Sequence, residues 1–535
     1  MSHLFRQRTW PWRSTRNDGR SRPGSTTLTA LFLFFIFSLL GLSLAYLLHL
    51  SLQISQAKKK SIVLGYAAEI GQKQAWDELR GRIASRGFPV ILSAELWTEL
   101  KENLATGGGR IVEEALGAGL PLIGAGRWEN LTWETDIRFT LERTRQRGRS
   151  IVAGFEGEMK ARATIPQTRG SRHASAALIL EIAGGHVPLA DFPVLVDRPQ
   201  DPEDIRDYAP KHHLTVNPPG RGLVVPLLNF GRPGLVPQDA CPALSETLRI
   251  KLFKPQDLTN RVLRQALGLE PSAEKVPDGV YLVRSDLGLG GVFVQGDLEE
   301  LILAVDEDAQ VVQFRSKAGL WTLRFDPRAE TTTFVTPTAT FDFDLVPGGT
   351  IAVNGKILSL GGGCPGDSGG FVLSPEEEVP CLAHGTRMTI VSSDSLTLTS
   401  HLIRQGVTWQ DGIPYLKEAD SGLILFSTGK EFLSDRATDG GVVIDHDAPE
   451  DIKVEASLVA PGRGFLVESA PGNERTIRLA GSIQASTIEN EGSSLVLTYD
   501  PAVSRPGDMS ASCPETTEPV LFVRALRVWK WNDAP

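Results

Sequence analysis

The sequence predicts an α+β protein. A long N-terminal helix, first transmembrane and then amphipathic, precedes a mainly β exported domain that is either an irregular β-solenoid or a sandwich. Three observations predict this class. Residues 29–52 form an apolar run without charge, no proline interrupts the helical pattern from Thr26 to Arg86, and after Asp278 nearly every apolar segment is short and turn-bounded.

The apolar run from Thr29 to Leu52 contains no Asp, Glu, Lys or Arg. At about 1.5 Å per residue, a helix of this length crosses a bilayer core of roughly 30 Å. A cleaved secretory signal would have a shorter apolar region followed by a small-residue cleavage site. Residues 55–60 read Ser-Gln-Ala-Lys-Lys-Lys and offer no such site. We therefore predict a transmembrane helix over residues 25–52, with residues 29–52 in lipid.

Charge flanking the span predicts its orientation. The tail of residues 1–24 carries one acid, Asp18, against six arginines: Arg6, Arg8, Arg13, Arg16, Arg20 and Arg22. By the positive-inside rule this tail stays in the cytoplasm. Lys58, Lys59 and Lys60 favour the opposite orientation but are fewer. We expect a single-pass anchor with the C-terminal domain exported.

The chain after the span divides by periodicity. Over residues 53–92, apolar residues recur near one helical face: Ile62, Tyr66, Ile70, Leu79 and Ile83. Residues 93–277 are of mixed type. A helix begins near Ser93, strands cover 131–141 and 177–182, a loop covers 201–219, and a helix covers 258–269.

Residues 278–535 are predicted to be β-rich. Short apolar segments such as 280–283, 292–294 and 350–360 are separated by Asn-Gly, Ser-Asp and Gly-Gly turns. This pattern is typical of a sandwich, a barrel or a β-solenoid. The region has no repeat of fixed period, so a solenoid would be irregular.

Composition excludes some partners and cofactors. The net charge is −9 and no basic stripe lies beyond the N-terminal tail, so we expect no nucleic-acid partner. Residues 287–291 lack the Lys-Ser/Thr pair of a phosphate-binding loop, and no cofactor is predicted. The four cysteines lack CxxC spacing. A Cys364–Cys381 disulfide is one prediction for an oxidising compartment, and free buried thiols are the other.

Four stretches together resemble a known family. They are Gly-Tyr-Ala-Ala-Glu-Ile-Gly at 65–71, Gly-Gly-Val-Phe-Val-Gln-Gly-Asp-Leu at 290–298, the Thr- and Ser-rich residues 385–399, and Leu-Thr-Tyr-Asp-Pro at 497–501. In these stretches and in its layout the chain resembles type IV pilus biogenesis proteins of the PilX type. Those proteins have a pilin-like N-terminal helix and a large exported β region.

The resemblance implies a minor pilin-like or pilus-assembly protein without enzymatic activity. It would be held in the bacterial inner membrane, with its C-terminal domain periplasmic or extracellular. Its partners would be other pilin-like or pilus-assembly proteins. Pilins usually carry a glycine before their cleavage point and a glutamate at the fifth mature position. If Gly24 is that glycine, the fifth residue is Thr29, and no acid occurs between Gly24 and Leu52. A permanently anchored assembly factor fits better than a polymerising pilin, and cleavage at Gly24-Ser25 stays open.

A second hypothesis comes from residues 363–370, which read Gly-Cys-Pro-Gly-Asp-Ser-Gly-Gly. A membrane-anchored trypsin-like protease would use Ser368 as nucleophile, with Asp297 and His213 as acid and base. Such a site needs a base, an acid that orients it and backbone donors for the oxyanion. No earlier histidine lies in an Ala-Ala-His-Cys context, and tight turns favour these same small residues. The sequence therefore favours a turn, with no catalytic residue.

Other candidate sites are weaker. His212 and His213 have only Asp207 nearby, which is too few ligands for a metal site. Residues 445–447 read Asp-His-Asp, but adjacent residues on a strand cannot all face one ion, so a solvated turn is favoured. A carbohydrate- or surface-binding adhesin is a third hypothesis. Exposed aromatic clusters would support it, and Trp529 and Trp531 alone do not decide it.

Overall fold

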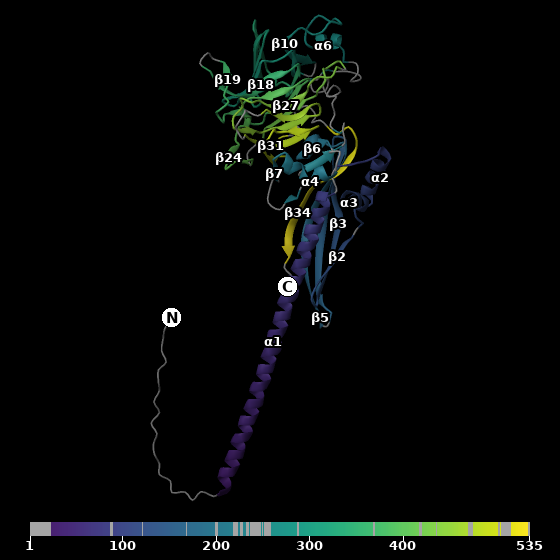
Figure 1. Ribbon diagram of the computed structural model, residues 1–535, viewed down its shortest axis with the longest axis vertical. Coiled ribbons are helices and arrows are strands. Elements are labelled where there is room, and N and C mark those ends of the chain that lie inside the picture. The colour runs from purple at the N-terminus through teal and green to yellow at the C-terminus, as the bar shows by residue number, and fades with distance from the viewer. Residues whose placement is uncertain are drawn as a thin grey trace, which may run out of the picture.

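The computed structural model describes residues 23–85, 89–119, 121–166, 168–197, 202–217, 223–224, 228–231, 235, 248, 250, 258–285, 288–366, 370–416, 420–434, 436–468, 475–500, 503 and 515–532. Figure 1 shows a long helical stalk with a β-rich body at its far end. The α+β class is confirmed, because one long apolar helix precedes a mostly β structure.

Helix α1 (Pro23–Ser85) is a single helix of 63 residues. Its most apolar window has a mean hydropathy of 2.5 and none of it is buried, so it is long and apolar enough to cross a membrane. The predicted continuity of the helix is confirmed, but the predicted buried face is wrong in part. Ile62 and Tyr66 are 59% and 63% exposed, whereas Leu79 and Ile83 are buried.

The face of α1 that packs on the sheet is built largely of small residues. Its buried members are Leu64, Ala67, Ala68, Gly71, Gln72, Ala75, Leu79 and Ile83. Gly71 faces the indole of Trp133, and a Cβ at Gly71 would lie 2.6 Å from Trp133 Cδ1. Small side chains let the helix axis approach the sheet closely, and packing of this kind outweighs hydrophobicity in choosing the face. This is why the bulky Ile62, Tyr66 and Ile70 face outward.

The helix packs on a seven-stranded antiparallel sheet that we call the proximal sheet. Its order is β1 (Val90–Ile91), β34 (Val520–Asn532), β5 (Thr168–Gly185), β4 (Ser150–Ile165), β3 (Leu131–Arg147) and β2 (Leu122–Trp128), with β8 (Leu223–Val224) also pairing with β34. The last strand of the chain thus pairs with a strand of the N-terminal third, with Val520 opposite Gly185. The sheet crosses the predicted boundary at residue 278.

Two short helices follow α1 along the chain, α2 (Ala94–Ala105) and α3 (Gly109–Leu116). The predicted start of α2 is confirmed, because Ser93 Oγ accepts a hydrogen bond from Leu96 N–H at 3.2 Å, a standard N-cap. Residues of α2 and α3, with Trp97, Leu100 and Ile111 among them, join the core cluster beside the sheet.

The body is built around two large sheets whose central strands are parallel. The first runs β10 (Gly279–Ser285), β11 (Gly288–Gln295), β17 (Thr350–Asn354), β21 (Arg387–Ser392), β26 (Gly422–Ser427), β29 (Ser457–Ala460), β31 (Thr476–Ala485), β33 (Ser494–Tyr499) and β7 (Leu214–Asn217), joined by β6 (Val194–Asp197), β9 (Leu228–Gly231) and β28 (Asp451–Val454).

The second large sheet continues from an antiparallel arm into parallel strands. Its order is β16 (Thr340–Phe343), β15 (Thr331–Val335), β14 (Gly319–Asp326), β13 (Ala309–Ser316), β12 (Glu300–Asp306), β18 (Ile357–Pro365), β22 (Leu396–Leu398), β27 (Gly441–Ile444), β30 (Gly464–Val467) and β32 (Ile488–Glu489), with β19 (Phe371–Leu373) beside β18. Two small pairs complete the body: β20 (Pro380–Leu382) with β23 (Ile403–Arg404), and β24 (Thr408–Gln410) with β25 (Ile413–Tyr415).

Consecutive strands of the body alternate between these two sheets. From β17 the chain passes to β18, and the order β21, β22, β26, β27, β29, β30, β31, β32 repeats the same alternation, apart from short side strands. Each strand pairs in parallel with the next strand of its own sheet. The largest core cluster lies between the sheets and holds Val292, Val294, Ile351 and Leu396.

Two further predictions can be compared with the structure. The helix α6 (Asn260–Ala266) lies within the predicted 258–269 segment. The predicted loop at 201–219 is wrong, because it contains α4 (Pro202–Lys211) and strand β7. Tyr208 of α4 is buried and packs edge-on against Phe230 with ring centroids 5.4 Å apart. An aromatic anchor of this kind stabilises a helix that a Pro- and Asp-rich composition does not reveal.

Candidate functional site

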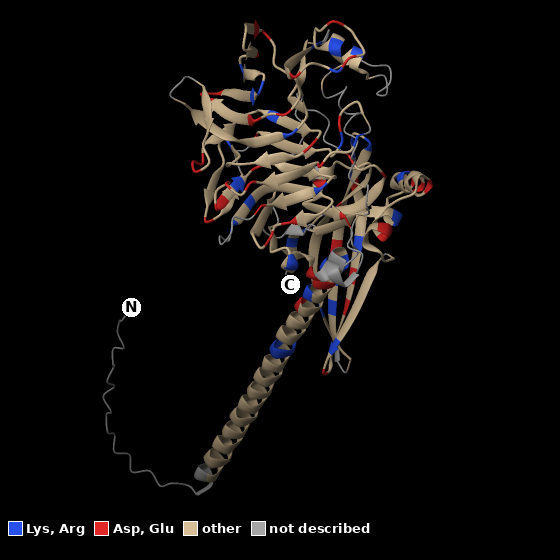
Figure 2. Cartoon of the chain, turned by 45° about the horizontal axis from the view of Figure 1, so that its top comes forward, with Lys and Arg blue, Asp and Glu red and all other residues tan. Residues whose placement is uncertain are grey.

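The first half of α1 is an unpartnered apolar surface. Large side chains stay exposed along it, including Leu28 at 76%, Phe34 at 73% and Leu42 at 73%. After Pro23 the first charged residue is Lys58, and Figure 2 shows this part of the stalk free of charged residues. In water such a surface is unfavourable by roughly 25 cal/mol per Å² of apolar area. It requires an apolar environment such as a membrane or a bundle of other helices.

The exposed apolar surface continues past the first charges. Ile62, Tyr66 and Ile70 are 59%, 63% and 40% exposed and recur every four residues, so they form one stripe on the outer face of α1. We call these three residues the ridge. It lies beside the proximal sheet and has no partner in the part of the chain that the structure describes. The ridge and the apolar half together form the candidate interaction site.

Ser368 lies outside the described residues, as do Asp367 and Gly369. The flanking residues show what kind of segment carries them. Strand β18 pairs antiparallel with β19, and Gly366 N–H donates to Gly370 O at 2.7 Å. The residues on either side of this stretch therefore pair as the two strands of a hairpin, and the turn interpretation of residues 367–369 stays a prediction.

The acid and base of the protease hypothesis do not meet. Asp297 follows β11 and its Oδ1 accepts a hydrogen bond from Lys356 N–H at 2.8 Å. His213 precedes β7, and its carbonyl accepts from Leu495 N–H at 3.0 Å. Seven strand-to-strand steps separate β11 from β7 in the first sheet. At about 4.8 Å per step they are roughly 34 Å apart, so an Asp297–His213 pair is excluded.

Two later histidines lie nearer the hairpin but have other partners. His401 is buried and its Nδ1 accepts a hydrogen bond from Lys453 N–H at 3.0 Å. Burial lowers the pKa of His401, so the ring is neutral with its Nδ1 already occupied. His384 Nδ1 pairs with Asp420 Oδ1 at 3.2 Å. Because Ser368 itself is not described, no contact between it and either ring is assigned.

The considered Cys364–Cys381 disulfide is not formed, and both thiols are free. The reason is register. A Cβ placed on Gly362 would lie 3.3 Å from Cys381 Cβ, so Cys381 faces Gly362 of β18. Cys364 lies two residues further along that strand, about 6–7 Å away. A disulfide needs its Cβ atoms about 4 Å apart.

The two histidines of the first candidate metal site, His212 and His213, have different surroundings. His212 stacks on Tyr208 with ring centroids 4.3 Å apart, and burial lowers its pKa. His213 is exposed with a positive φ of 43°, which is a turn conformation. Among the described residues, His212, His213 and Asp207 form no ligand cluster.

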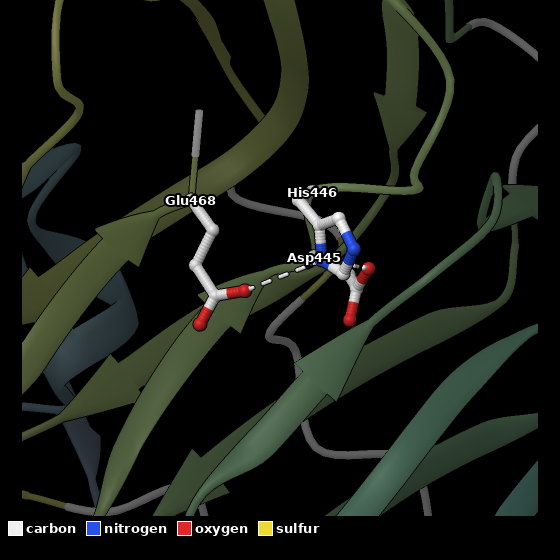
Figure 3. Close-up of side chains that lie close together, drawn as sticks. All are labelled: Asp445, His446 and Glu468. Atoms are coloured by element: carbon white, nitrogen blue, oxygen red, sulfur yellow. Dashed lines mark ion pairs between the residues drawn. The ribbon is translucent and has the colours of Figure 1, made fainter. Parts of the chain in front are cut away.

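Figure 3 shows the cluster that does form, Asp445, His446 and Glu468. His446 Nδ1 lies 3.1 Å from Asp445 Oδ1 and 3.8 Å from Glu468 Oε2, so one nitrogen faces both carboxylates. Arg475 lies under the same loop and donates to the carbonyls of Asp445 and His446 at 2.6 Å each. A guanidinium so close disfavours a second cation. The solvated-turn interpretation fits this geometry better than a metal site.

One buried polar cluster has no signal in the sequence. Arg404 is 1% exposed, and its guanidinium donates to Glu455 Oε2 at 3.0 Å and Asp500 Oδ2 at 2.7 Å. Trp409 Nε1–H donates to the other oxygen of Glu455 at 2.7 Å. These residues come from well-separated parts of the chain, so periodicity does not reveal them. The charged groups of this cluster are buried and hydrogen-bonded to one another, so we interpret the cluster as part of the folded core and not as a binding or catalytic site.

No protein-family model matches the chain, and no curated protein matches it in sequence. A solved structure with a similar chain is the competence-associated pilin ComZ from Thermus thermophilus. The two are 12% identical, with 88% of this chain and 97% of that chain covered and a TM-score of 0.21. A likeness at that TM-score carries no argument about function.

Proposed function

We propose that this protein is a membrane-anchored, pilin-like component of pilus assembly that acts through protein contacts and not through catalysis. The observation that carries the proposal is the division of α1. Its first half is apolar and its most apolar window has no buried residue, and its second half packs on the proximal sheet through small residues. A rigid helix of this kind joins a membrane to a folded body.

The charge pattern supports an orientation. The arginine-rich tail lies in the cytoplasm and the β-rich part lies outside the bacterial inner membrane. No acid occurs from Gly24 to Leu52, and in lipid a neighbouring subunit's terminal amine would be left without its usual counter-charge. The proposed role is therefore that of a permanent anchor that assists assembly, and not of a filament subunit.

The strand order supports a β-solenoid for the body. Alternation between two parallel sheets is the connectivity of a coil in which each turn contributes one strand to each sheet. The turns differ in length, in agreement with an irregular solenoid. In the sequence, this body lies between β5 and β34, two strands that pair with each other in the proximal sheet. A solenoid body presents long side surfaces to partners.

The ridge is the proposed contact surface for pilin-like partners. Its three side chains lie just outside the span, where another anchored helix running beside α1 would meet them. The test places a photo-crosslinking amino acid at Tyr66 in cells that carry the protein. Ile123 on β2, 75% exposed, is the matched control.

We expect a crosslink to another membrane-anchored subunit from position 66 and none from position 123. The triple variant Ile62→Ser, Tyr66→Ser, Ile70→Ser should lose pilus assembly while remaining in the membrane fraction. If the variant assembles pili normally, the ridge is not the contact surface. If the wild-type chain is recovered in the soluble fraction, the anchor itself is wrong.

The protease hypothesis predicts a different result, which a covalent probe distinguishes. Full-length protein in detergent is treated with a fluorophosphonate, which labels activated serines. We expect no label at Ser368, and a Ser368→Ala variant that supports assembly like the wild type. Labelling of native but not heat-denatured protein at Ser368 would replace the proposal with a serine protease.

A further inference from the structure

A trough of about 520 Å³ lies between α1 and the free end of the proximal sheet. Its wall on one side is α1, and its floor is β5 and β34. It is lined by Gly65, Glu69, Gln72, Lys73, Trp76, Asp77, Arg80, Arg172, Ala174 and Trp531. The α1 positions run from Gly65 to Arg80, about 22 Å at 1.5 Å per residue, so the trough is elongated along the helix. Its volume is that of a ligand site.

Gln72 contributes an unpaired hydrogen-bond donor beside the trough. Its side chain is 5% exposed, and its Nε2 amide is buried without a hydrogen-bond acceptor among the described residues. Leaving such a donor unpaired costs about 1–3 kcal/mol. Because Nε2 has almost no accessible surface, the Gln72 side chain must turn toward the trough before a ligand carbonyl oxygen can accept its hydrogen bond.

The rest of the lining excludes one class of occupant. Grooves that accept an amphipathic helix are lined with large aliphatic side chains. This lining contains no Leu, Ile, Val, Met or Phe among the described residues. Its two largest apolar side chains are the indoles of Trp76 and Trp531, and the latter is 51% exposed. Flat aromatic faces offer area to the flat apolar face of a ring.

The polar lining is suited to hydroxyl groups. Glu69 and Asp77 present carboxylates, and Arg80 and Arg172 present guanidinium groups. Carboxylates accept and guanidinium groups donate in forked geometries, which match neighbouring hydroxyls on a ring. Arg172 also donates to Ser61 Oγ at 2.7 Å, which fixes that guanidinium at the membrane-side end of the floor.

We propose that the trough binds an oligosaccharide of N-acetylated amino sugars. The indoles stack on sugar rings, and the carboxylates and guanidinium groups bind ring hydroxyls. The Gln72 side chain turns toward the trough on binding, and an acetamido carbonyl then accepts the hydrogen bond from its Nε2. The elongated shape fits a short linear chain of such sugars. This site goes beyond the proposed function, and it does not depend on the ridge or on pilus partners.

The test measures binding of tetra-N-acetylchitotetraose to full-length protein in detergent micelles by isothermal titration calorimetry. We expect saturable binding. Trp531→Ala should weaken it at least tenfold, because the exposed indole is lost. Trp529→Ala is the matched control. Trp529 is 69% exposed on the same strand but does not line the trough, and its loss should change affinity less than twofold.

Two further measurements test the role of the amide. Gln72→Leu removes the donor at nearly constant volume and should weaken binding at least fivefold, with a cooperative thermal unfolding curve as the check on folding. Cellotetraose, which has the same linkage but hydroxyls in place of acetamido groups, should bind at least fivefold more weakly to the wild type. If Gln72→Leu does not fold, the Trp531 pair and the two sugars still decide the question.

The proposal is overturned by any of three results. These are no saturable binding of tetra-N-acetylchitotetraose at millimolar concentration, equal binding to the wild type and Trp531→Ala, or equal affinity for cellotetraose. A photo-crosslinker at Lys73 that captures a helical subunit in cells, with no sugar binding in vitro, would assign the trough to a protein partner instead.

Discussion

The proximal sheet and the body bury their strands in different ways. Strand β3 alternates between buried and partly exposed residues along its first half, because α1 covers only one face of it. In the body, all six residues of β26 are buried, because the first large sheet is covered on both faces. Val292 and Val294 point into the cluster between the sheets, and Phe293 joins the cluster shared with α2 and α3.

This difference shows where each region keeps its polar groups. The proximal sheet exposes polar side chains to water. The body has nowhere to expose them along its covered strands, so it pairs many of them internally, although the hydroxyls of Thr350 and Thr389 have no partner among the described residues. Ser457 and Ser482, which face each other on β29 and β31, have hydroxyl oxygens 2.6 Å apart, and Arg404 pairs with two acids. In the body, substitutions that leave a buried charge unpaired should therefore change the free energy of unfolding most. Under α1, substitutions that add side-chain volume should change it most.

The largest effect should come from Arg404→Leu in the body. It leaves Glu455 and Asp500 buried without their cation, which should lower the free energy of unfolding by about 3–5 kcal/mol. Denaturant titration of full-length protein in detergent measures the change. The control replaces all three residues together with Met, Leu and Leu, which should recover most of the loss. A single variant within 1 kcal/mol of the wild type would show that the cluster is not coupled to folding.

The second effect tests shape under α1. Gly71→Val places a Cβ 2.6 Å from Trp133 Cδ1, so the indole or the helix must shift. We expect a loss of about 1–3 kcal/mol in the free energy of unfolding. Gly81→Ala on the same helix is the control, because a Cβ there meets nothing within 4 Å. Gly81→Ala should be neutral or stabilise by up to about 1 kcal/mol. Equal effects at both positions would contradict close packing at Gly71.

A third effect is pH-dependent and lies where the two regions join. Burial raises the pKa of Asp197, at the end of β6, from 3.8 to about 6. The folded state therefore binds a proton that the unfolded state has released, and stability from this group falls as pH rises from 3.8 to about 6. Asp197→Asn should be more stable than the wild type by about 1 kcal/mol above pH 7, allowing for partial solvent screening.

The difference between Asp197→Asn and the wild type should disappear below about pH 3, where the wild-type carboxyl is protonated in both states. Unfolding curves at several pH values measure this convergence. A gap that stays constant from pH 4 to pH 8 would mean that the substitution acts through packing and not through titration.

The smallest effect concerns the thiols, and no change in stability is expected from it. Burial raises the pKa of Cys381 to about 12, so little thiolate forms at neutral pH. Iodoacetamide at pH 8 should label Cys364, which is partly exposed, and leave Cys381 unlabelled in the folded protein. Peptide mass spectrometry reads both sites. Peptides joined through these two cysteines would contradict the free thiols.

Local pattern predicted the elements better than their packing. The length of α1, the cap at Ser93 and the strands at 280–283 and 292–294 follow from periodicity and turn residues, and the structure confirms them. The face of α1 was misjudged because the largest apolar residues were assumed to be buried, whereas Ala67, Ala68 and Gly71 allow closer contact. The helix at 202–211 depends on Tyr208 packing against a distant strand.

The candidate site was predictable only in its apolar half. The unbroken run to Leu52 is visible in the sequence, and so is the absence of an acid within it. The trough is not, because it needs Trp76 and Gln72 of α1 beside Trp531 of the last strand. Contacts between residues so far apart leave no periodic signal. The same is true of the pairing of β34 with β5.

That last pairing has a mechanical consequence. Because Val520 stands opposite Gly185, the chain enters and leaves the body through two neighbouring strands of the sheet, and among the described residues only the short β8 rejoins that sheet in between. A pull on the body is therefore shared by two covalent connections and spread along the ladder between β5 and β34 before it reaches the stalk.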